Sequence, residues 1–448
     1  MAKVSMKKKA LALALLLAGV GGNAAAISLQ QAYEAALKND PQYRMNFYEN
    51  ESAKENRILG RSNLLPQVSA SYSASRNIAD LEVISSNPKL GNELTHPRYI
   101  SRSSAVQVRQ PILNLDGWMR YRQGKVQTEQ GAKQFESDTA QVILRVVGAY
   151  SDALFAEDQV ALSKVQRDMY LEQMKVNRRL FEKGEGTKTD MLETQARLDL
   201  AEAQLVEAQD NATAMRDTLA GVIGMDPGTL DPLGADFHFQ DRAPKSFEDL
   251  RAAALAHNPQ LAAARLAVEN ARLEIQRDKA GHAPRVDLIA AYSKDDAASL
   301  TTYNQNTVNR TIGVQVNIPI YQGGAINATT RQAAASWNRA QADFDNRTNQ
   351  VMVELRKAYD LVQNSTAKIN ALEKAVASGR ELMKATEQSI KGGVRINLDL
   401  LNAQQQLYTS QRDLAQARYM YLLGLLRMRA AAGTLDAGAV REVAAYFH

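Results

Sequence analysis

The stretches that decide the fold read GEGTKTDMLETQ at residues 184–195 and GGVRINLDLLNAQ at residues 392–404. Each places glycine ahead of an Asp-x-Leu-x-x-Gln pattern, and each follows a long run without proline, at 118–181 and 325–390. At ~1.5 Å per residue, a helix of that length would extend roughly 95 Å, far more than an ordinary globular helix. Glycine frees the backbone to turn between antiparallel helices. Each stretch therefore predicts the tip of a long helical hairpin.

The helices beside these turns carry the spacing of coiled coils. Seam residues step by alternating threes and fours along two of them: Ile369, Leu372, Val376, Gly379, Met383, Thr386 and Ile390, and Leu198, Ala201, Leu205, Ala208, Ala212, Met215, Leu219 and Val222. The last helix has large residues seven apart (Leu400, Leu407, Leu414, Tyr421, Met428) beside a row of small ones (Ala403, Ser410, Ala417, Gly424, Ala431). Large residues that face small ones let helices approach closely. The pattern predicts interlocking antiparallel helices.

The hairpin stretches belong to an internal duplication. Residues 38–42 (KNDPQ) correspond to 256–260 (AHNPQ), and 65–68 (LPQV) correspond to 283–286 (APRV), at one offset. The duplication predicts two repeats, each with the order helix, strand, loop, strand, long helix, turn and helix. The expected division is a first repeat at 27–225, a linker at 226–245, a second repeat at 246–432 and a C-terminal tail at 433–448. The first helix of each repeat is expected at about 28–62 and 246–281.

Four short segments alternate apolar and polar residues as strands do. They are expected at about 66–76, 102–111, 284–293 and 309–319, with Pro111 and Pro319 closing the second strand of each pair. Such strands suit either a soluble sheet on helices or a membrane barrel wall, for which ~9–11 residues suffice. Lipid does not tolerate open sheet edges, and four strands cannot close a barrel. A spanning sheet would therefore need other copies, and three would supply twelve strands.

Residues 1–26 are typical of a secretory signal peptide, with lysines at 7–9, an apolar stretch at 10–20 and an A-x-A cleavage site at 24–26. The full chain has a formal charge of +5 and a pI near 9.1. Four of its 54 Lys and Arg residues lie in this leader, which leaves 50 basic against 49 acidic residues. The basicity therefore does not indicate a nucleic-acid-binding surface.

The composition lacks the groups of catalytic and metal sites. The chain has no cysteine, which excludes disulfides, thiolate metal sites and a lipid anchor at the cleavage site. None of the five histidines lies within four residues of another, so no helical zinc pair is set up. Residues 184–189 lack the spacing of a phosphate-binding loop. The sequence therefore predicts no enzyme, no cofactor and no metal site.

The duplication, the prolines at 66 and 284 and the two glycine-led tips together resemble the TolC family of outer-membrane channels, across essentially the whole mature length. The resemblance implies a mixed α and membrane β fold: a homotrimer with a twelve-stranded β-barrel in the Gram-negative outer membrane, continued by an α-helical barrel in the periplasm. The absent lipidation cysteine and the short tail after Gly433 look most like the branch that serves type I protein secretion.

The same resemblance implies a periplasmic gate just past the second tip. Arg395 and Asp399 match the family's gating arginine and first aspartate, and Asp190 matches the acidic partner across the tip. Ile390 stands where the family's best-known member has a gating tyrosine, and Asn402 stands where it has a second aspartate. A weaker gate or a milder ion selectivity is expected from these two departures. On spacing alone, Arg395 and Asp399 also fit an ordinary i,i+4 surface pair.

Partners follow from the resemblance as well. It implies outer-membrane lipid, an inner-membrane ABC transporter and a periplasmic adaptor (membrane fusion protein) that docks at the tip turns, namely Gly184, Glu185, Gly186, Gly392 and Gly393. Two alternatives stay open: the outer-membrane component of a multidrug or metal efflux pump, and a soluble periplasmic coiled-coil adaptor or scaffold. The strands favour a channel over the scaffold. The exported substrate and the partner pump are not encoded in the chain.

Overall fold

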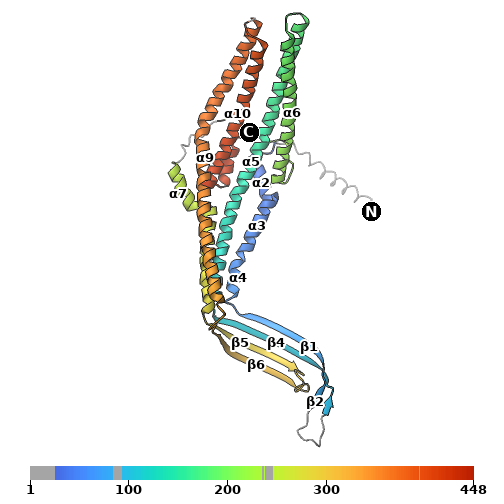
Figure 1. Ribbon diagram of the computed structural model, residues 1–448, viewed down its shortest axis with the longest axis vertical. Coiled ribbons are helices and arrows are strands. Elements are labelled where there is room, and N and C mark those ends of the chain that lie inside the picture. Colours follow the sequence, from blue (N-terminus) through green and yellow to red (C-terminus); the bar gives the residue numbers. More distant parts are fainter. Residues whose placement is uncertain (1–25, 84–92, 235–236, 238–245, 393) are drawn as a thin grey trace, which may run out of the picture. The chain divides into compact units, whose positions relative to one another are not determined.

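Four strands pair in one antiparallel sheet of order β1-β4-β5-β6 (Figure 1). The computed structural model describes residues 26–83, 93–234, 237, 246–392 and 394–448, so the expected signal peptide at 1–26 lies outside the described residues except for its last residue. The strands are β1 (Gln67–Ile78), β4 (Arg98–Leu113), β5 (Arg285–Asp296) and β6 (Asn306–Asn317). The second strand of the first repeat thus pairs with the first strand of the second repeat.

The strands reach further toward their connecting loops than the sequence pattern predicts. Backbone pairing continues into polar residues, so β4 begins at Arg98 rather than at 102 and β5 ends at Asp296 rather than at 293. Pro111 does not close β4; it lies inside the strand at a bulge, a position that needs no N–H donor. Pro319 lies beyond the end of β6. Within the long loop of the first repeat, β2 (Leu81–Val83) and β3 (Glu93–Thr95) form a separate pair.

The sheet has an apolar face and a polar face, as the alternation predicts. Cross-strand partners place one continuous row on the apolar face: Val68, Val108, Ala290 and Ile312. The neighbouring row on the polar face holds Ser69, Gln107, Ala291 and Thr311. The edge-strand residues of this row are open, with Val68 68% and Ile312 77% exposed, while Val108 and Ala290 are half-buried. An apolar sheet face open on this scale indicates contact with lipid or with another chain.

Two long helical hairpins follow the strands in the chain. They consist of α5 (Leu115–Glu182) with α6 (Lys188–Ile223), and of α9 (Ala325–Lys391) with α10 (Asn397–Ala431) (Figure 1). The chain divides into two compact units. The sheet unit comprises the described residues within 49–133 and 262–346, and the hairpin unit comprises those within 26–48, 134–261 and 347–448. The long helices α5 and α9 supply residues to both.

The first helix of each repeat is broken, which the prediction of single helices at 28–62 and 246–281 missed. The first repeat has α2 (Leu29–Asn39), α3 (Pro41–Lys54) and α4 (Asn56–Ser62), and the second has α7 (Phe247–His257), α8 (Pro259–Lys279) and the 3-10 turn η1 (Ala280–His282). Both main breaks come just before a proline, Pro41 or Pro259, because proline disfavours a helical conformation in the residue that precedes it. The prolines of the repeated Asp/Asn-Pro-Gln sequence carried this signal.

The two breaks are fixed by the same device. In the first repeat, Asn39 Nδ2 donates to Ile223 O at the end of α6 at 3.1 Å. In the second, Asn258 Nδ2 donates to Ala431 O at the end of α10 at 2.9 Å. These amides satisfy carbonyls that a helix C-terminus leaves without an intrahelical donor. Each repeat therefore ties the end of its last helix to the break in its first one.

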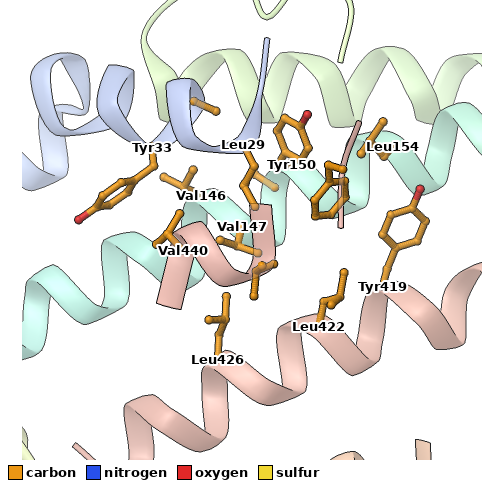
Figure 2. Close-up of a cluster of buried hydrophobic side chains, with 14 of the residues drawn as sticks. Leu29, Tyr33, Val146, Val147, Tyr150, Leu154, Tyr419, Leu422, Leu426 and Val440 are labelled. Atoms are coloured by element: carbon orange, nitrogen blue, oxygen red, sulfur yellow. The ribbon is translucent and has the colours of Figure 1, made fainter. Parts of the chain in front are cut away.

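The largest apolar core lies in the hairpin unit, where α2, α5 and α10 meet the last helix, α11 (Ala437–Ala444). Figure 2 shows the side chains that converge there: Leu29, Tyr33, Val146, Val147, Tyr150, Leu154, Tyr419, Leu422, Leu426 and Val440. The stretch at 433–448 is thus not a loose tail. Its Phe447 pairs with Leu233 of the inter-repeat segment, and His448 N donates to Pro232 O at 3.1 Å.

The seams read from the sequence are buried. In α10 both rows are buried except for the half-buried Leu414, and the large Leu407 and the small Ala403 and Gly424 are among the buried residues. A Cβ at Gly424 would lie 3.0 Å from Leu361 Cδ2 of α9, and one at Gly379 of α9 would lie 3.3 Å from Leu407 Cδ1. Each helix thus places a glycine against a leucine of the other helix, which explains the close approach that the spacing predicts.

Asp158 of α5 is expected to make the free energy of unfolding depend on pH. Tyr419 O–H donates to its Oδ2 at 2.8 Å, and burial raises the pKa of the carboxyl above 3.8, against the lowering effect of that hydrogen bond. The folded state then binds this proton more tightly than the unfolded chain, so stability falls as pH rises through the folded pKa. Asp158→Asn, which keeps an acceptor for Tyr419, is expected to flatten this slope above pH 3.8. Thermal unfolding followed by circular dichroism across this range checks it, and an unaltered slope would contradict it.

Candidate functional site: the hairpin tips

The first tip turns through glycine and is capped by threonine. Gly184 adopts a left-handed backbone with φ of 77°, and the amides of Glu185 and Gly186 both donate to Leu180 O, at 2.9 and 3.1 Å. Thr187 then caps α6, because its Oγ1 accepts from Asp190 N at 3.0 Å. The same hydroxyl donates to Asp190 Oδ2 at 2.5 Å. The Asp190 carboxylate is thereby held at the N-terminus of α6, where the helix dipole favours negative charge.

The second tip is less tightly held. The amides of Gly392 and Val394 donate to Gln388 O and Ser389 O, at 3.1 and 2.9 Å, but Ile396 at the N-cap of α10 has no side-chain oxygen to cap the helix. Val394 is 82% exposed and Ile396 is also exposed. Gly393, expected in this turn, lies outside the described residues. This tip thus presents apolar side chains to solvent, a feature typical of a partner-binding surface.

A set of polar side chains, buried except for the half-buried Gln173, joins the two hairpins just behind the tips. We call this set the tip ladder; it consists of Gln173 and Asn177 of α5, Thr194 of α6 and Asn397 of α10. Asn177 Nδ2 and Asn397 Nδ2 both donate to Thr194 Oγ1, at 2.8 and 3.0 Å, and Thr194 Oγ1 donates to Asp190 O at 2.8 Å. Gln173 Nε2 donates to Asn177 Oδ1 and to Asn397 Oδ1, at 3.0 and 2.9 Å.

Further from the tips, apolar and polar contacts alternate along the same helices. A small cluster of Tyr170, Leu198, Ala201 and Leu401 follows the ladder. Burial raises the pKa of the Tyr170 phenol, against the lowering effects of Gln166 and Arg197. Gln166 Nε2 then donates to Gln405 Oε1 at 2.8 Å. Because buried polar groups need their partners, these contacts fix the register of α10 against α5 and α6.

The expected gate residues lie around the ladder without forming one cluster. Arg395 is exposed, and Asp399 and Ile390 are half-buried. Within the part of the chain that the structure describes, no salt bridge joins Arg395 to Asp399 or to Asp190; the Asp190 carboxylate contacts Thr187 instead. Asn402 accepts from Arg197 Nη2 of α6 at 3.2 Å, so it also links α10 to the first hairpin.

Reasoning from the sequence missed the tip ladder. Its members are short polar residues within long apolar seams, and Thr194 lies four residues before Leu198 on the seam of α6. A polar residue at a seam position is a readable signal of register, as buried asparagines are in coiled coils. The sequence alone does not show that three helices bring these residues together.

The arrangement can hold two hairpins together through neutral hydrogen bonds, and it offers no reactive group. In the described ranges, no three His, Asp or Glu side chains are grouped so that they could bind a metal ion. Among the described helices, none combines the length and the apolarity that crossing a bilayer requires. Within one chain, the ladder joins α5 and α6 of the first hairpin to α10 of the second.

Comparisons with known proteins find relatives along almost the whole chain. A family model described as outer membrane efflux protein matches residues 32–225 and 250–434. The chain is 38% identical to the alkaline protease secretion protein AprF of Pseudomonas aeruginosa over 427 residues, which cover 95% of this chain and 88% of that protein. It is 37% identical to the proteases secretion protein PrtF of Dickeya chrysanthemi over 446 residues, which cover 99% and 96%.

More distant relatives share the fold. Outer membrane protein TolC of Escherichia coli is 28% identical over 94% of this chain and 85% of its own length. Among solved structures, CusC superposes with a TM-score of 0.76 at 15% identity, covering 91% of this chain and 92% of its own. The outer membrane protein VceC of Vibrio cholerae superposes with a TM-score of 0.75 at 17% identity, covering 90% and 96%.

Proposed function

Because the chain belongs to the outer membrane efflux protein family, its place is the outer membrane, and we propose that it forms the homotrimeric exit channel of a type I protein secretion system. The resemblance to the TolC family and the fold expected for one chain, four antiparallel strands with long helices, are confirmed. The proposed role is transport, and it requires no catalytic group.

The observation that carries the channel is the four-stranded sheet with two free edges. β1 and β6 are its edge strands, and both faces of β6 are exposed. An edge left open in lipid would leave backbone groups without hydrogen bonds. Since the sheet has an even number of antiparallel strands, β6 of one copy runs opposite to β1 of the next. Copies can therefore continue the antiparallel pattern, and three close a twelve-stranded wall with its polar face toward water.

Cross-linking across this junction tests the trimer. The chain has no cysteine, so a double variant Ser71→Cys on β1 and Thr311→Cys on β6 carries the only thiols. With a thiol-reactive linker of ~8 Å, comparable to the separation of diagonal neighbours on adjacent strands, the double variant is expected to give a covalent trimer in outer-membrane fractions. Either single variant is expected to give at most a dimer. Only monomer and dimer bands from the double variant would contradict ring closure.

A protein substrate and its partners are supported by the two secretion relatives. AprF and PrtF are more similar to this chain than TolC is, at 38% and 37% identity against 28%. We infer an inner-membrane ABC transporter and a periplasmic adaptor as partners. Replacing PrtF by this chain in a cell that exports proteases tests the inference, and recovery of extracellular protease is expected. A second test expresses the chain in a cell that lacks its own efflux channel. Recovery of drug resistance there, without recovery of protease export, would favour the efflux alternative. That alternative is suggested by the 26% identical outer membrane efflux protein BepC of Brucella suis.

The tips are the proposed docking and gating end. Exposed Val394 and Ile396, together with the turn at Gly184, Glu185 and Gly186, offer the adaptor an apolar surface beside a charged one. In the proposed gate, Arg395, Asp399 and Asp190 act between copies, since in the described segments of one chain Arg395 forms no ion pair with Asp399 or with Asp190.

The gate predicts a change in conductance. Arg395→Ser and Asp399→Ala are each expected to raise the single-channel conductance in planar bilayers, because each removes a charge that holds the narrow end closed. Ile390 and Asn402 make the starting gate weaker, so a change of about twofold is expected rather than a loss of closure. Lys384→Ser, which removes an exposed charge from α9 further from the tip, is the matched control. Conductance unchanged in both variants would remove these residues from the gate.

A further inference from the structure

Basic side chains gather on the apolar face of the sheet near the ends of the strands that face the loops. Because residues alternate between faces along a strand, the register assigns one set to the same face as Val68 and Ile312. We call this set the basic belt; it consists of Arg76, Arg98, Arg102, Lys294 and Arg310. All five are exposed.

The belt has little opposite charge to neutralise it. Within the four strands, which the structure describes in full, the only acidic residue on this face is Asp296, and Arg102 Nη1 lies 3.3 Å from its Oδ2. Its neighbour Asp295 belongs to the polar face, where it accepts from Ser103 Oγ at 2.6 Å. The belt therefore keeps a surplus of positive charge that faces away from the polar side of the sheet.

Two tyrosines lie beside cations of the belt, Tyr72 in the cross-strand row of Lys294 and Tyr292 in that of Arg310. Tyr72 and Tyr292 lie on the same face, and the Arg310 guanidinium lies 5.9 Å from the Tyr292 ring centroid. Along β1 and β5, this face changes from aliphatic residues to a tyrosine and then to a cation, Arg76 on β1 and Lys294 on β5. Hydrocarbon, interface and charged head group follow one another in the same order in a membrane leaflet, and aromatic side chains favour the interface.

We propose that the basic belt binds phosphorylated lipid head groups of the outer leaflet. Arginine suits this ligand, because its planar guanidinium donates two parallel hydrogen bonds to phosphate oxygens. The charge of the belt is complementary to phosphate, and the apolar rows beside it are complementary to acyl chains. The inference rests on the proposed function in one respect: the apolar face must meet lipid, with the loop ends of the strands toward the outside.

Lipid binding to the purified full-length trimer tests the belt. In vesicles of phosphatidylcholine, lipid A is titrated in and the bound lipid is measured by native mass spectrometry. We expect a quadruple variant (Arg76→Gln, Arg102→Gln, Lys294→Gln, Arg310→Gln) to weaken lipid A binding about tenfold or more, because each basic residue near an anionic surface contributes measurably to attraction. A second variant, with Arg76, Arg98, Arg102 and Arg310 changed to Lys, keeps the charge and is expected to bind within about threefold of the parent.

Controls separate the belt from net charge and from free phosphate. A variant with Lys368, Lys374, Arg380 and Lys384 of α9 changed to Gln loses the same four charges and is expected to bind lipid A like the parent. Dephosphorylated lipid A and inorganic phosphate alone serve as probes without a phosphorylated lipid head group. For each of them, we expect no difference in binding between the parent and the quadruple variant. Equal lipid A binding by parent and quadruple variant would overturn the belt, as would binding that does not need the lipid phosphates.

The same preparations distinguish a failure of the basic belt from a failure of the proposed channel function. If the parent conducts in planar bilayers but binds lipid A no better than the quadruple variant, the belt is wrong and the channel stands. If the parent forms no pore in any lipid, the channel is wrong, and the belt falls with it because its apolar face then has no bilayer to meet.

Discussion

Gly433→Ala is expected to lower the free energy of unfolding by about 2–4 kcal/mol, from two separate causes. Gly433 has a left-handed backbone with φ of 72°, and it closes α10 in a Schellman motif: Thr434 N donates to Arg429 O at 2.8 Å and Gly433 N to Ala430 O at 3.0 Å. An alanine there pays the steric cost of the left-handed conformation. Its Cβ would also lie 2.5 Å from His257 C and 2.6 Å from Asn258 N.

The second cause is the larger one, because the obstructing atoms belong to backbone that cannot rotate aside. They lie at the break between α7 and α8. Asn258 at this break links α8 to α10, donating to Ala431 O at 2.9 Å and accepting from Leu261 N at 3.1 Å. Moving this backbone to admit a methyl group would strain both hydrogen bonds. Overpacking of this kind costs about 1–3 kcal/mol beyond the backbone term.

Gly228→Ala is the matched control. Gly228 also has a left-handed backbone, with φ of 59°, but a Cβ there would meet no atom within 4 Å. It is expected to show only the backbone cost of about 1 kcal/mol. Thermal or urea unfolding of the two variants in detergent, followed by circular dichroism, compares them. If both lose the same stability, the contact between α10 and the α7–α8 break is not what makes Gly433 necessary.

The hairpins and the strand faces could be predicted from the sequence because both rest on local periodicity. Heptad steps and period-two alternation are properties of one segment, and the structure buries Leu407 and Gly424 and exposes Ile312 as those patterns require. The strand ends were missed because pairing extends into polar residues such as Asp296 once the partner strand is present. The breaks before Pro41 and Pro259 had a local signal in the prolines themselves.

The site was harder to predict, because its parts come together only in the tertiary structure. The turn glycines were evident from spacing, whereas nothing in a single helix pairs Asn397 with Thr194, 203 residues away. The two repeats also diverge at this point: the first tip has Thr187 as its cap, and the second has Ile396. The duplication therefore predicted two equivalent tips, while the structure has one capped tip and one with exposed apolar residues.

Thr194→Val is expected to lower the free energy of unfolding by about 2–4 kcal/mol and to raise single-channel conductance. Thr194 is fully buried, and its Oγ1 receives hydrogen bonds from Asn177 and Asn397 while it donates to Asp190 O. Valine keeps the shape but removes the oxygen, so it leaves buried amide groups without this acceptor. Each buried group left without a partner costs about 1–3 kcal/mol. Because these bonds join α10 to the first hairpin, the tips should separate more easily.

Two further variants decide whether the hydroxyl is responsible. Thr194→Ser keeps the oxygen and is expected to lose only about 1 kcal/mol, for one methyl group, with parental conductance. Thr213→Val removes a hydroxyl that makes the same kind of bond on the same helix, to Gln209 O at 3.1 Å, but at an exposed position, so it is expected to change stability by no more than about 0.5 kcal/mol. Urea unfolding in detergent and planar-bilayer recordings give the two readouts. The Thr194 hydroxyl makes one of the ladder's two hydrogen bonds between the hairpins, beside the one from Gln173 to Asn397. We therefore expect stability and conductance to change together in Thr194→Val and in neither control. A conductance change shared by Thr194→Ser would instead assign the effect to packing around the methyl group.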